Sequence, residues 1–237
     1  MTLDATHDPG LRSWVETANE PGCEFPIQNL PFGIFKRKGS HESPRGGVAI
    51  GDQILDLAAL GLKTGPTLNG IAAMGRPAWK KLRAALSRGL SQKKPNLRLR
   101  RFLVPMEKAE LFLPLDIGDY TDFFTGIHHA TNMGRMLRPD NPLLPNYKWV
   151  PIGYHGRAST VNASGGSFVR PSGQVKGPQD ESPRFAASQR LDIELEIGIF
   201  IGRPNVQGQP IPIVQAEDHG FGHVLFHDWS ARGIQGW

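Results

Sequence analysis

The clearest pattern in the chain is a strict alternation of apolar and polar residues over positions 191–197. Asp192, Glu194 and Glu196 alternate with leucine and isoleucine. This period of two predicts a β-strand with one acidic face. Glu194 and Glu196 then project to the same side, with Cα atoms roughly 6.5–7 Å apart. The pattern becomes wholly apolar at Ile199-Phe200-Ile201, as in a buried strand.

Two carboxylates on one strand face repel each other unless a cation lies between them. The strand therefore predicts a metal site with Glu194 and Glu196 as ligands. The alternative is a solvent-exposed edge strand, whose charged face protects against aggregation. This stretch alone leaves both interpretations open.

Two aspartates are candidates to complete such a site. An apolar run predicts a strand that ends on Asp228, with a helix beginning at Ser230, although Asp228 or Ser230 could simply cap that helix. Asp122 lies in a predicted loop, where aspartates usually form turns. If these carboxylates meet Glu194 and Glu196, the ligand set is all oxygen, which Ca²⁺ and Mg²⁺ prefer.

Histidine spacing offers a competing zinc site. His219, His223 and His227 recur every four residues, which on a helix would align three imidazoles. The glycines and apolar residues between them disfavour a helix. On a strand, His223 and His227 would point away from Asp228.

Other polar residues could take part in catalysis or anion binding. His128 and His129 are candidates for a general base, because an unperturbed histidine titrates near neutrality, although such a pair is often structural. Candidates for anion binding are Arg138, Arg157 and Arg232, of which Arg157 could equally belong to a tight turn.

Upstream, the pattern predicts a leader over residues 1–24, with a short helix around 11–18, and a small mixed domain over 25–113. A strand is expected at 32–35. A hairpin is expected where Gly51-Asp52 separates two apolar runs.

Two helices are expected next, the first over residues 67–74. The second begins at Pro77 and ends at Pro95, because proline is tolerated in a first turn and disrupts a helix interior. Its apolar residues recur at helical spacing, which predicts a side packed on the core. They are Trp79, Leu82, Leu86 and Leu90.

Composition narrows the class of protein. The 237 residues suffice for one large or two small domains, and 28 glycines with 20 prolines suit short strands and many turns. The single cysteine, Cys23, excludes a disulfide framework and favours a reduced, cytoplasmic setting. The first residues do not resemble a signal peptide, and no apolar run approaches a membrane span.

The charge is unevenly distributed. The net charge is +5, but residues 76–108 hold eleven Lys or Arg against one acid, Glu107. This segment lacks interleaved aromatic residues and a recognisable nucleic-acid motif, so we interpret it as a solvated surface. We expect neither a nucleic-acid nor a membrane partner.

Seven segments, in order, resemble the fumarylacetoacetase (fumarylacetoacetate hydrolase) family. They are FPIQNLPFGIF at 25–35, GVAIGDQILDL at 47–57, IGDYTDFF at 117–124, HHATNMG at 128–134, LLPNYKWVPIGYHGRAS at 143–159, LDIELEIGIFIG at 191–202 and HDWSARGIQGW at 227–237.

The resemblance implies a mixed, β-rich (α+β) fold. It consists of a small SH3-like β-barrel with a helical insert, then a β-roll of the family's type beginning at residue 114. It also implies a homodimer that hydrolyses a carbon–carbon bond of 4-fumarylacetoacetate to fumarate and acetoacetate, in tyrosine and phenylalanine breakdown. The substrate is a small diketo acid, and the implied cofactor is Ca²⁺, Mg²⁺ or both.

The same resemblance assigns roles to single residues. The implied metal ligands are Asp122, Glu194, Glu196 and Asp228. His129 would activate water, and Arg232 with Gln235 would stabilise developing negative charge. The implied substrate contacts are Phe124, Arg138, Tyr154 and Gln235.

Three positions depart from the family. Phe124 stands where the family usually has tyrosine, so a hydroxyl contact to the substrate is missing. Gly233 replaces an aspartate and Gly236 a larger residue, and both glycines are expected to loosen the helix that carries Arg232 and Gln235.

The family sequence also continues beyond the position that matches Trp237. That part carries a lysine of the oxyanion site and a glutamate partner of the catalytic histidine. We therefore expect a fragment, with the remainder of the β-roll absent. The alternatives are a hydrolase of another diketo acid in the same superfamily and a non-catalytic metal-binding remnant.

Overall fold

The computed structural model describes residues 3–235, so Gly236 and Trp237 lie outside the described residues. The chain divides into two compact parts. The first joins residues up to Leu115 with residues from Ala163 onward, and the second covers Asp116–Asn162. Among the described residues, no helix has the length and apolar character that crossing a bilayer requires.

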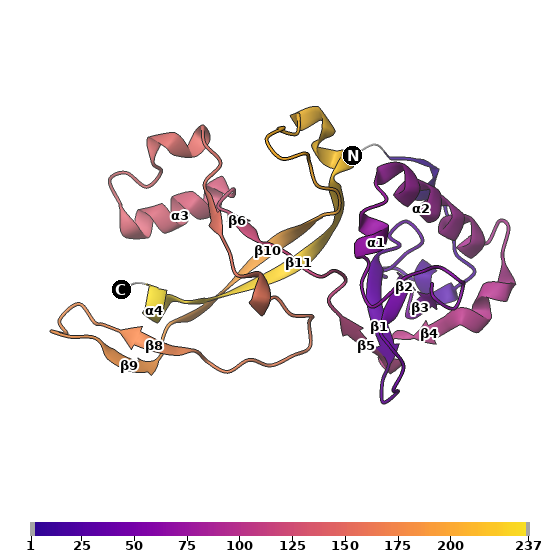
Figure 1. Cartoon of the computed structure of the whole chain (residues 1–237), viewed down its shortest axis with the longest axis horizontal. Coiled ribbons are helices and arrows are strands. Elements are labelled where there is room, and N and C mark those ends of the chain that lie inside the picture. The colour runs from indigo at the N-terminus through magenta and orange to yellow at the C-terminus, as the bar shows by residue number, and fades with distance from the viewer. Residues whose placement is uncertain (1–2, 236–237) are drawn as a thin grey trace. The chain divides into compact units, whose positions relative to one another are not determined.

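A five-stranded antiparallel sheet organises the N-terminal half of the first part (Figure 1). Its order is β4-β3-β2-β1-β5, which leaves β4 and β5 at the edges and forms no closed barrel within residues 3–235. The strands are β1 (Phe32–Arg37), β2 (Arg45–Ile50), β3 (Gln53–Asp56), β4 (Leu103–Pro105) and β5 (Ala109–Phe112).

The predicted strand at 32–35 and the hairpin across Gly51-Asp52 are confirmed. Ile50 pairs with Gln53, so the turn has two residues. Gly51 has φ +58°, a conformation that other residues rarely adopt. Val48 and Leu55 from this hairpin are fully buried in the main apolar cluster.

Helix α2 (Arg76–Leu90) covers that cluster with Leu86 and Leu90, which confirms the predicted core-facing stripe. The helix ends at Leu90 and not at Pro95. The backbone N–H of Trp14 donates to the Leu90 carbonyl at 3.1 Å, and Ser13 forms a β-bridge with Ser91. A contact with the leader, distant in sequence, therefore ends the helix before the proline.

The remaining N-terminal elements are short. Helix α1 is Asn69–Ala72, within the predicted range 67–74. The predicted helix around 11–18 is wrong, because this range contains only the start of a 3₁₀ turn, Glu16–Asn19. The other 3₁₀ turns of this half are Ala5–His7, Leu97–Phe102 and Met106–Lys108.

The second part contains a two-stranded sheet and one helix. Its elements are β6 (Thr121–Phe123), α3 (Ile127–Leu137), a 3₁₀ turn at Pro145–Lys148, β7 (Gly153–His155) and a 3₁₀ turn at Ala158–Thr160. Gly134 lies on the buried side of α3, where an added Cβ would come within 1.8 Å of the Pro142 carbonyl oxygen. This glycine permits the chain after α3 to fold back on the helix.

Two antiparallel pairs and a short helix complete the first part. The pairs are β8 (Ser172–Val175) with β9 (Arg184–Ala187), and β10 (Leu191–Ile201) with β11 (Gly220–Ala231). A 3₁₀ turn at Ile213–Asp218 precedes β11, and α4 (Arg232–Gln235) follows it. Figure 1 shows β10 and β11 as one long twisted hairpin, which we call the acidic ribbon.

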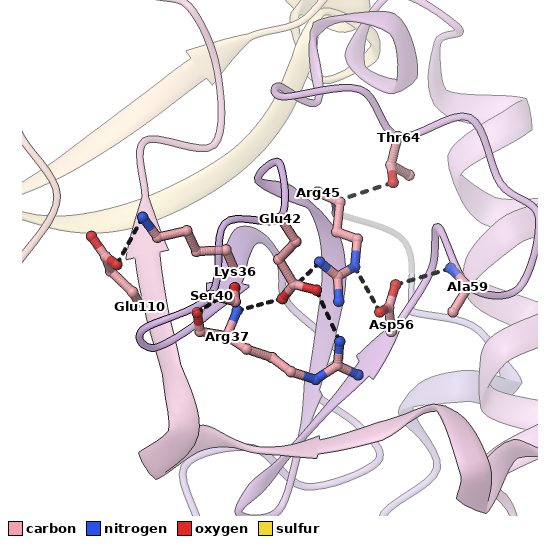
Figure 2. A network of polar contacts seen from close by, with 10 residues as sticks. Lys36, Arg37, Ser40, Glu42, Arg45, Asp56, Ala59, Thr64 and Glu110 are labelled. Atoms are coloured by element: carbon pink, nitrogen blue, oxygen red, sulfur yellow. Dashed lines mark hydrogen bonds and ion pairs between the residues drawn. The ribbon is translucent and has the colours of Figure 1, made fainter.

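A network of charged residues joins β1, β2 and β3 (Figure 2). Glu42 accepts a hydrogen bond from the Arg37 backbone at 2.7 Å and forms ion pairs with the Arg37 and Arg45 side chains at 3.1 and 3.0 Å. Partial burial raises the pKa of Glu42, but these hydrogen bonds and charges outweigh it and lower the pKa from 4.5 to about 2.

This lowered pKa predicts a pH dependence of stability. Since the folded-state pKa of Glu42 lies below its unfolded value, its contribution is complete above about pH 4.5 and is lost as pH falls towards about 2. We expect Glu42→Gln to remove this part of the acid-induced loss of stability. Urea denaturation of both proteins between pH 5 and pH 2.5 checks it, and curves that stay parallel throughout would refute it.

Candidate functional site

The acidic ribbon has two chemically different faces. On one face, Glu194 lies directly opposite Asp228, with Asp192 opposite Ser230 and Glu196 opposite Phe226. The predicted strand at 191–201 and its single acidic face are confirmed.

Strand β11 extends further than the sequence predicted. It continues to Ala231, and the helix begins at Arg232. The prediction that the strand ends on Asp228, with a helix from Ser230, is therefore wrong. Ser230 and Ala231 pair with the first residues of β10, so strand pairing replaces the expected helix cap.

Glu196 and Asp228 offer carboxylate oxygens within 4.8 Å of each other, and both side chains are half-buried. Glu194 faces Asp228 across the ladder. Like charges directly opposite each other destabilise a sheet, and here the Arg232 guanidinium, which donates to Glu194, offsets part of that repulsion. The donor set is oxygen only, so this face fits a hard divalent cation, which would remove the repulsion.

Arg232 organises the end of the acidic face near α4. Its guanidinium donates to Glu194 Oε1 and, at 3.2 Å, to Asp192 Oδ2. Its Nη1 donates to Gln235 Oε1 at 2.9 Å. The structure thus brings together Arg232, Gln235 and Glu194. Sequence reasoning gave no role to Asp192, although its position two residues before Glu194 places it on the same face.

Gly233 lies inside α4 and packs closely on the chain before β10. A Cβ added there would lie 3.0 Å from Ser188 Oγ. The Gly233 backbone N–H points at the Arg190 carbonyl, with 3.4 Å between nitrogen and oxygen. The four-residue helix is retained in spite of the glycine.

The opposite face of the ribbon is apolar and exposed. Leu195 and Leu225 are 73% and 79% exposed. His227 pairs with Leu195 and His223 with Ile199 on this face, so both histidines lie on the side away from Asp228, as the alternation predicted. The register therefore argues against a zinc site built from these histidines and Asp228.

In the second compact part, Asp122 lies in strand β6 and not in a loop. It pairs with Tyr154 of β7, whose hydroxyl donates to Asp122 Oδ2 at 2.5 Å. Sequence reasoning treated Tyr154 as a substrate contact and missed this bond, because 32 residues separate the partners.

Helix α3 carries His128, His129 and, immediately after its last residue, Arg138. Both histidines are exposed. The ring of Phe124 lies edge-to-face against His129, with 5.2 Å between ring centroids. Phe124 therefore contacts the imidazole that the family resemblance implies as the base. The segment before Arg157, which could have been a tight turn, begins with strand β7.

Comparison with known proteins gives the same family along most of the chain. Residues 28–114 match the family model described as Fumarylacetoacetase N-terminal, and residues 120–237 match Fumarylacetoacetate (FAA) hydrolase C-terminal.

The fumarylacetoacetases of Oryza sativa subsp. japonica, Caenorhabditis elegans and Rattus norvegicus are 49%, 49% and 47% identical to the chain. The alignments cover 96%, 90% and 90% of the chain and 58%, 56% and 55% of these relatives. The chain thus spans less than two thirds of their length.

Proposed function

Because the chain belongs to the fumarylacetoacetase family of hydrolases, we propose that it carries the metal-binding part of a carbon–carbon bond hydrolase acting on 4-fumarylacetoacetate. The observation that carries this proposal is the acidic face, where Glu194 lies opposite Asp228 and beside Glu196. Asp122 is the fourth proposed ligand, as the resemblance to the family implies. The ion is Ca²⁺ or Mg²⁺, since all four ligands offer carboxylate oxygens.

The proposed roles follow the reaction. A divalent cation bound there would polarise the attacked carbonyl and favour the enolate that leaves when the carbon–carbon bond breaks. His129 removes a proton from water, whose oxygen bonds to that carbonyl carbon, and the acetoacetate carbanion departs and is protonated.

Arg232 and Gln235 donate towards the developing oxyanion, a contribution of roughly 3–4 kcal/mol per donor in comparable sites. Their mutual hydrogen bond and the contacts of Arg232 with Asp192 hold the guanidinium in place before the substrate arrives. Arg138, Tyr154 and Phe124 contact the substrate in this proposal.

The proposal also covers the fold type, the oligomeric state, the metabolic pathway and the location of the protein. The structure is a mixed, β-rich fold of open sheets and ribbons. We propose that residues 25–113 are an N-terminal domain of SH3-like barrel type and that residues 114–237 are part of a β-roll. Homodimer formation, tyrosine and phenylalanine catabolism and a cytoplasmic location are proposed from the family and from the single Cys23.

The test is loss of the diketone absorbance of fumarylacetoacetate when the full chain is incubated with Ca²⁺ or Mg²⁺. We expect His129→Gln to lower turnover by about 10²–10⁴-fold, the usual contribution of a general base. His128→Gln is the matched control on the same helix and should keep full activity.

Two results would contradict the proposal. Equal turnover in the wild-type chain and His129→Gln would remove the role of His129. Ca²⁺ binding with no turnover in the wild-type chain would contradict the proposed catalysis, although not the proposed metal site, and would favour the non-catalytic metal-binding remnant.

A further inference from the structure

A β-bulge lies at the end of the acidic ribbon that is nearest to the loop connecting its strands. Cα partners run without interruption from Leu191↔Ala231 to Phe200↔Gly222, and the next pair is Ile201↔Gly220. Phe221 is therefore the extra residue of β11, without a residue opposite it in β10. On the other side of the bulge the register is uniform and includes Glu194↔Asp228.

The side chain of this extra residue packs into the N-terminal half of the same compact part. The rings of Phe221 and Trp79 meet edge-to-face with centroids 5.3 Å apart, and both contact the buried cluster of Ile34, Leu68 and Ile71. The indole N–H of Trp79 donates to the Ile71 carbonyl at 2.8 Å. Trp79 is thus fixed by its hydrogen bond and by the buried cluster, and its ring packs against Phe221.

Two more contacts seat this end of the ribbon against α1 and α2. A Cβ added at Gly202 would lie 2.7 Å from the Ala72 carbonyl oxygen, so only glycine fits there without a shift. Arg76 forms ion pairs with Glu217 at 3.2 Å and Asp218 at 3.1 Å, just before β11. Close backbone packing at Gly202, ring packing at Phe221 and the ion pairs of Arg76 therefore all position this end of the ribbon against α1 and α2.

Register decides whether the acidic face exists. Side chains alternate along a strand, so a slip of one residue would move Asp228 to the face opposite Glu194 and Glu196. Among the described residues, β10 and β11 pair only with each other, and an isolated two-stranded hairpin is marginally stable in water. A contact outside the two strands can therefore favour one register over another.

We propose that Phe221, through its packing against Trp79, sets the register of the acidic ribbon and so brings together the carboxylates that would bind the cation. Phe221 and Trp79 are positioning residues, since the anchor lies at the bulge and the acids lie further along the ribbon. The consequence for metal binding rests on the proposed function, whereas the register itself does not.

Disulfide trapping in the full chain tests the register directly, in a Cys23→Ser background. Ile197 and Leu225 are paired, so cysteines at these positions have the Cα separation that a disulfide needs. A second pair, Ile197→Cys with Val224→Cys, reports a slip of one residue. We expect the first pair to oxidise faster than the second, and Phe221→Ala to lose this preference.

The matched control is Phe185→Ala, the same change at a ring in β9 that is 77% exposed, and it should keep the preference. If Phe221→Ala does not fold, Gly202→Ala serves instead, because its methyl group would push the ribbon off Ala72. Gly222→Ala is its control, since an added Cβ there meets no atom within 4 Å.

The preference persisting in folded Phe221→Ala or Gly202→Ala would overturn the proposal. Ca²⁺ titration of the same proteins should show weaker binding in Phe221→Ala and unchanged binding in Phe185→Ala. Loss of register in Phe221→Ala, with no Ca²⁺ binding in any protein including the wild type, would support the register role and contradict the proposed metal function alone.

Discussion

Replacing Asp228 with asparagine is expected to weaken Ca²⁺ binding by more than about 100-fold, since even the loss of a supporting hydrogen bond in a metal site costs roughly 10–100-fold. The same substitution should stabilise the metal-free protein by about 0.2–1 kcal/mol, because it removes a negative charge within 4.8 Å of the Glu196 carboxylate, while Glu194 keeps its ion pair with Arg232. The two effects have opposite signs, and a general loss of folding cannot produce that combination.

Thermal denaturation with and without Ca²⁺ measures both effects. Wild-type protein should gain stability as Ca²⁺ is added, whereas Asp228→Asn should start higher in chelator and gain nothing. Asp192→Asn is the control on the same face, because Asp192 pairs with Arg232 and is not among the proposed ligands. An Asp228→Asn protein that Ca²⁺ still stabilises would contradict the proposed ligand role.

The second large effect concerns the charged network of the N-terminal sheet. Asp56 is 2% exposed, accepts a hydrogen bond from Arg45 at 2.7 Å and also accepts one from the Ala59 backbone at 3.0 Å. Asp56→Ala removes the more deeply buried of the two carboxylates that pair with Arg45, so that only Glu42 remains, and it leaves the Ala59 backbone N–H without this acceptor. We expect a loss of about 3 kcal/mol in the free energy of unfolding, typical of breaking one side of a buried pair.

A surface pair in the same view provides the comparison (Figure 2). Lys36 and Glu110 form an ion pair at 3.2 Å, with side chains 26% and 48% exposed. Glu110→Ala should cost at most about 1 kcal/mol, because solvent screens exposed pairs. Chemical denaturation of both variants at neutral pH gives the two values. Equal losses would show that burial does not strengthen the Arg45–Asp56 contact.

Local patterns in the sequence predicted those features that depend on neighbouring residues. Alternation at 191–197 defined the acidic face, because strand periodicity is a property of the backbone alone. The turn at Gly51 and the apolar side of α2 could also be predicted from the sequence, because each depends only on residues that are close together along the chain.

Features that depend on distant partners were not accessible. Helix α2 ends at Leu90 because the leader contacts it there, and no local signal marks that contact. The hydrogen bond from Tyr154 to Asp122 and the bulge at Phe221 likewise require strand pairing to be known. The site roles of His129 and Gln235 came from resemblance to a family, since neither residue stands out by spacing.

The most direct test of the account is to count bound ions by equilibrium dialysis of the full chain against Ca²⁺, with Glu196→Gln in parallel. Glu196 and Asp228 offer carboxylate oxygens within 4.8 Å of each other. We predict one saturable Ca²⁺ per wild-type chain and none for Glu196→Gln over the same concentration range. Equal Ca²⁺ binding by the two proteins, or none by the wild-type chain, would contradict the central claim that the acidic face is a metal site.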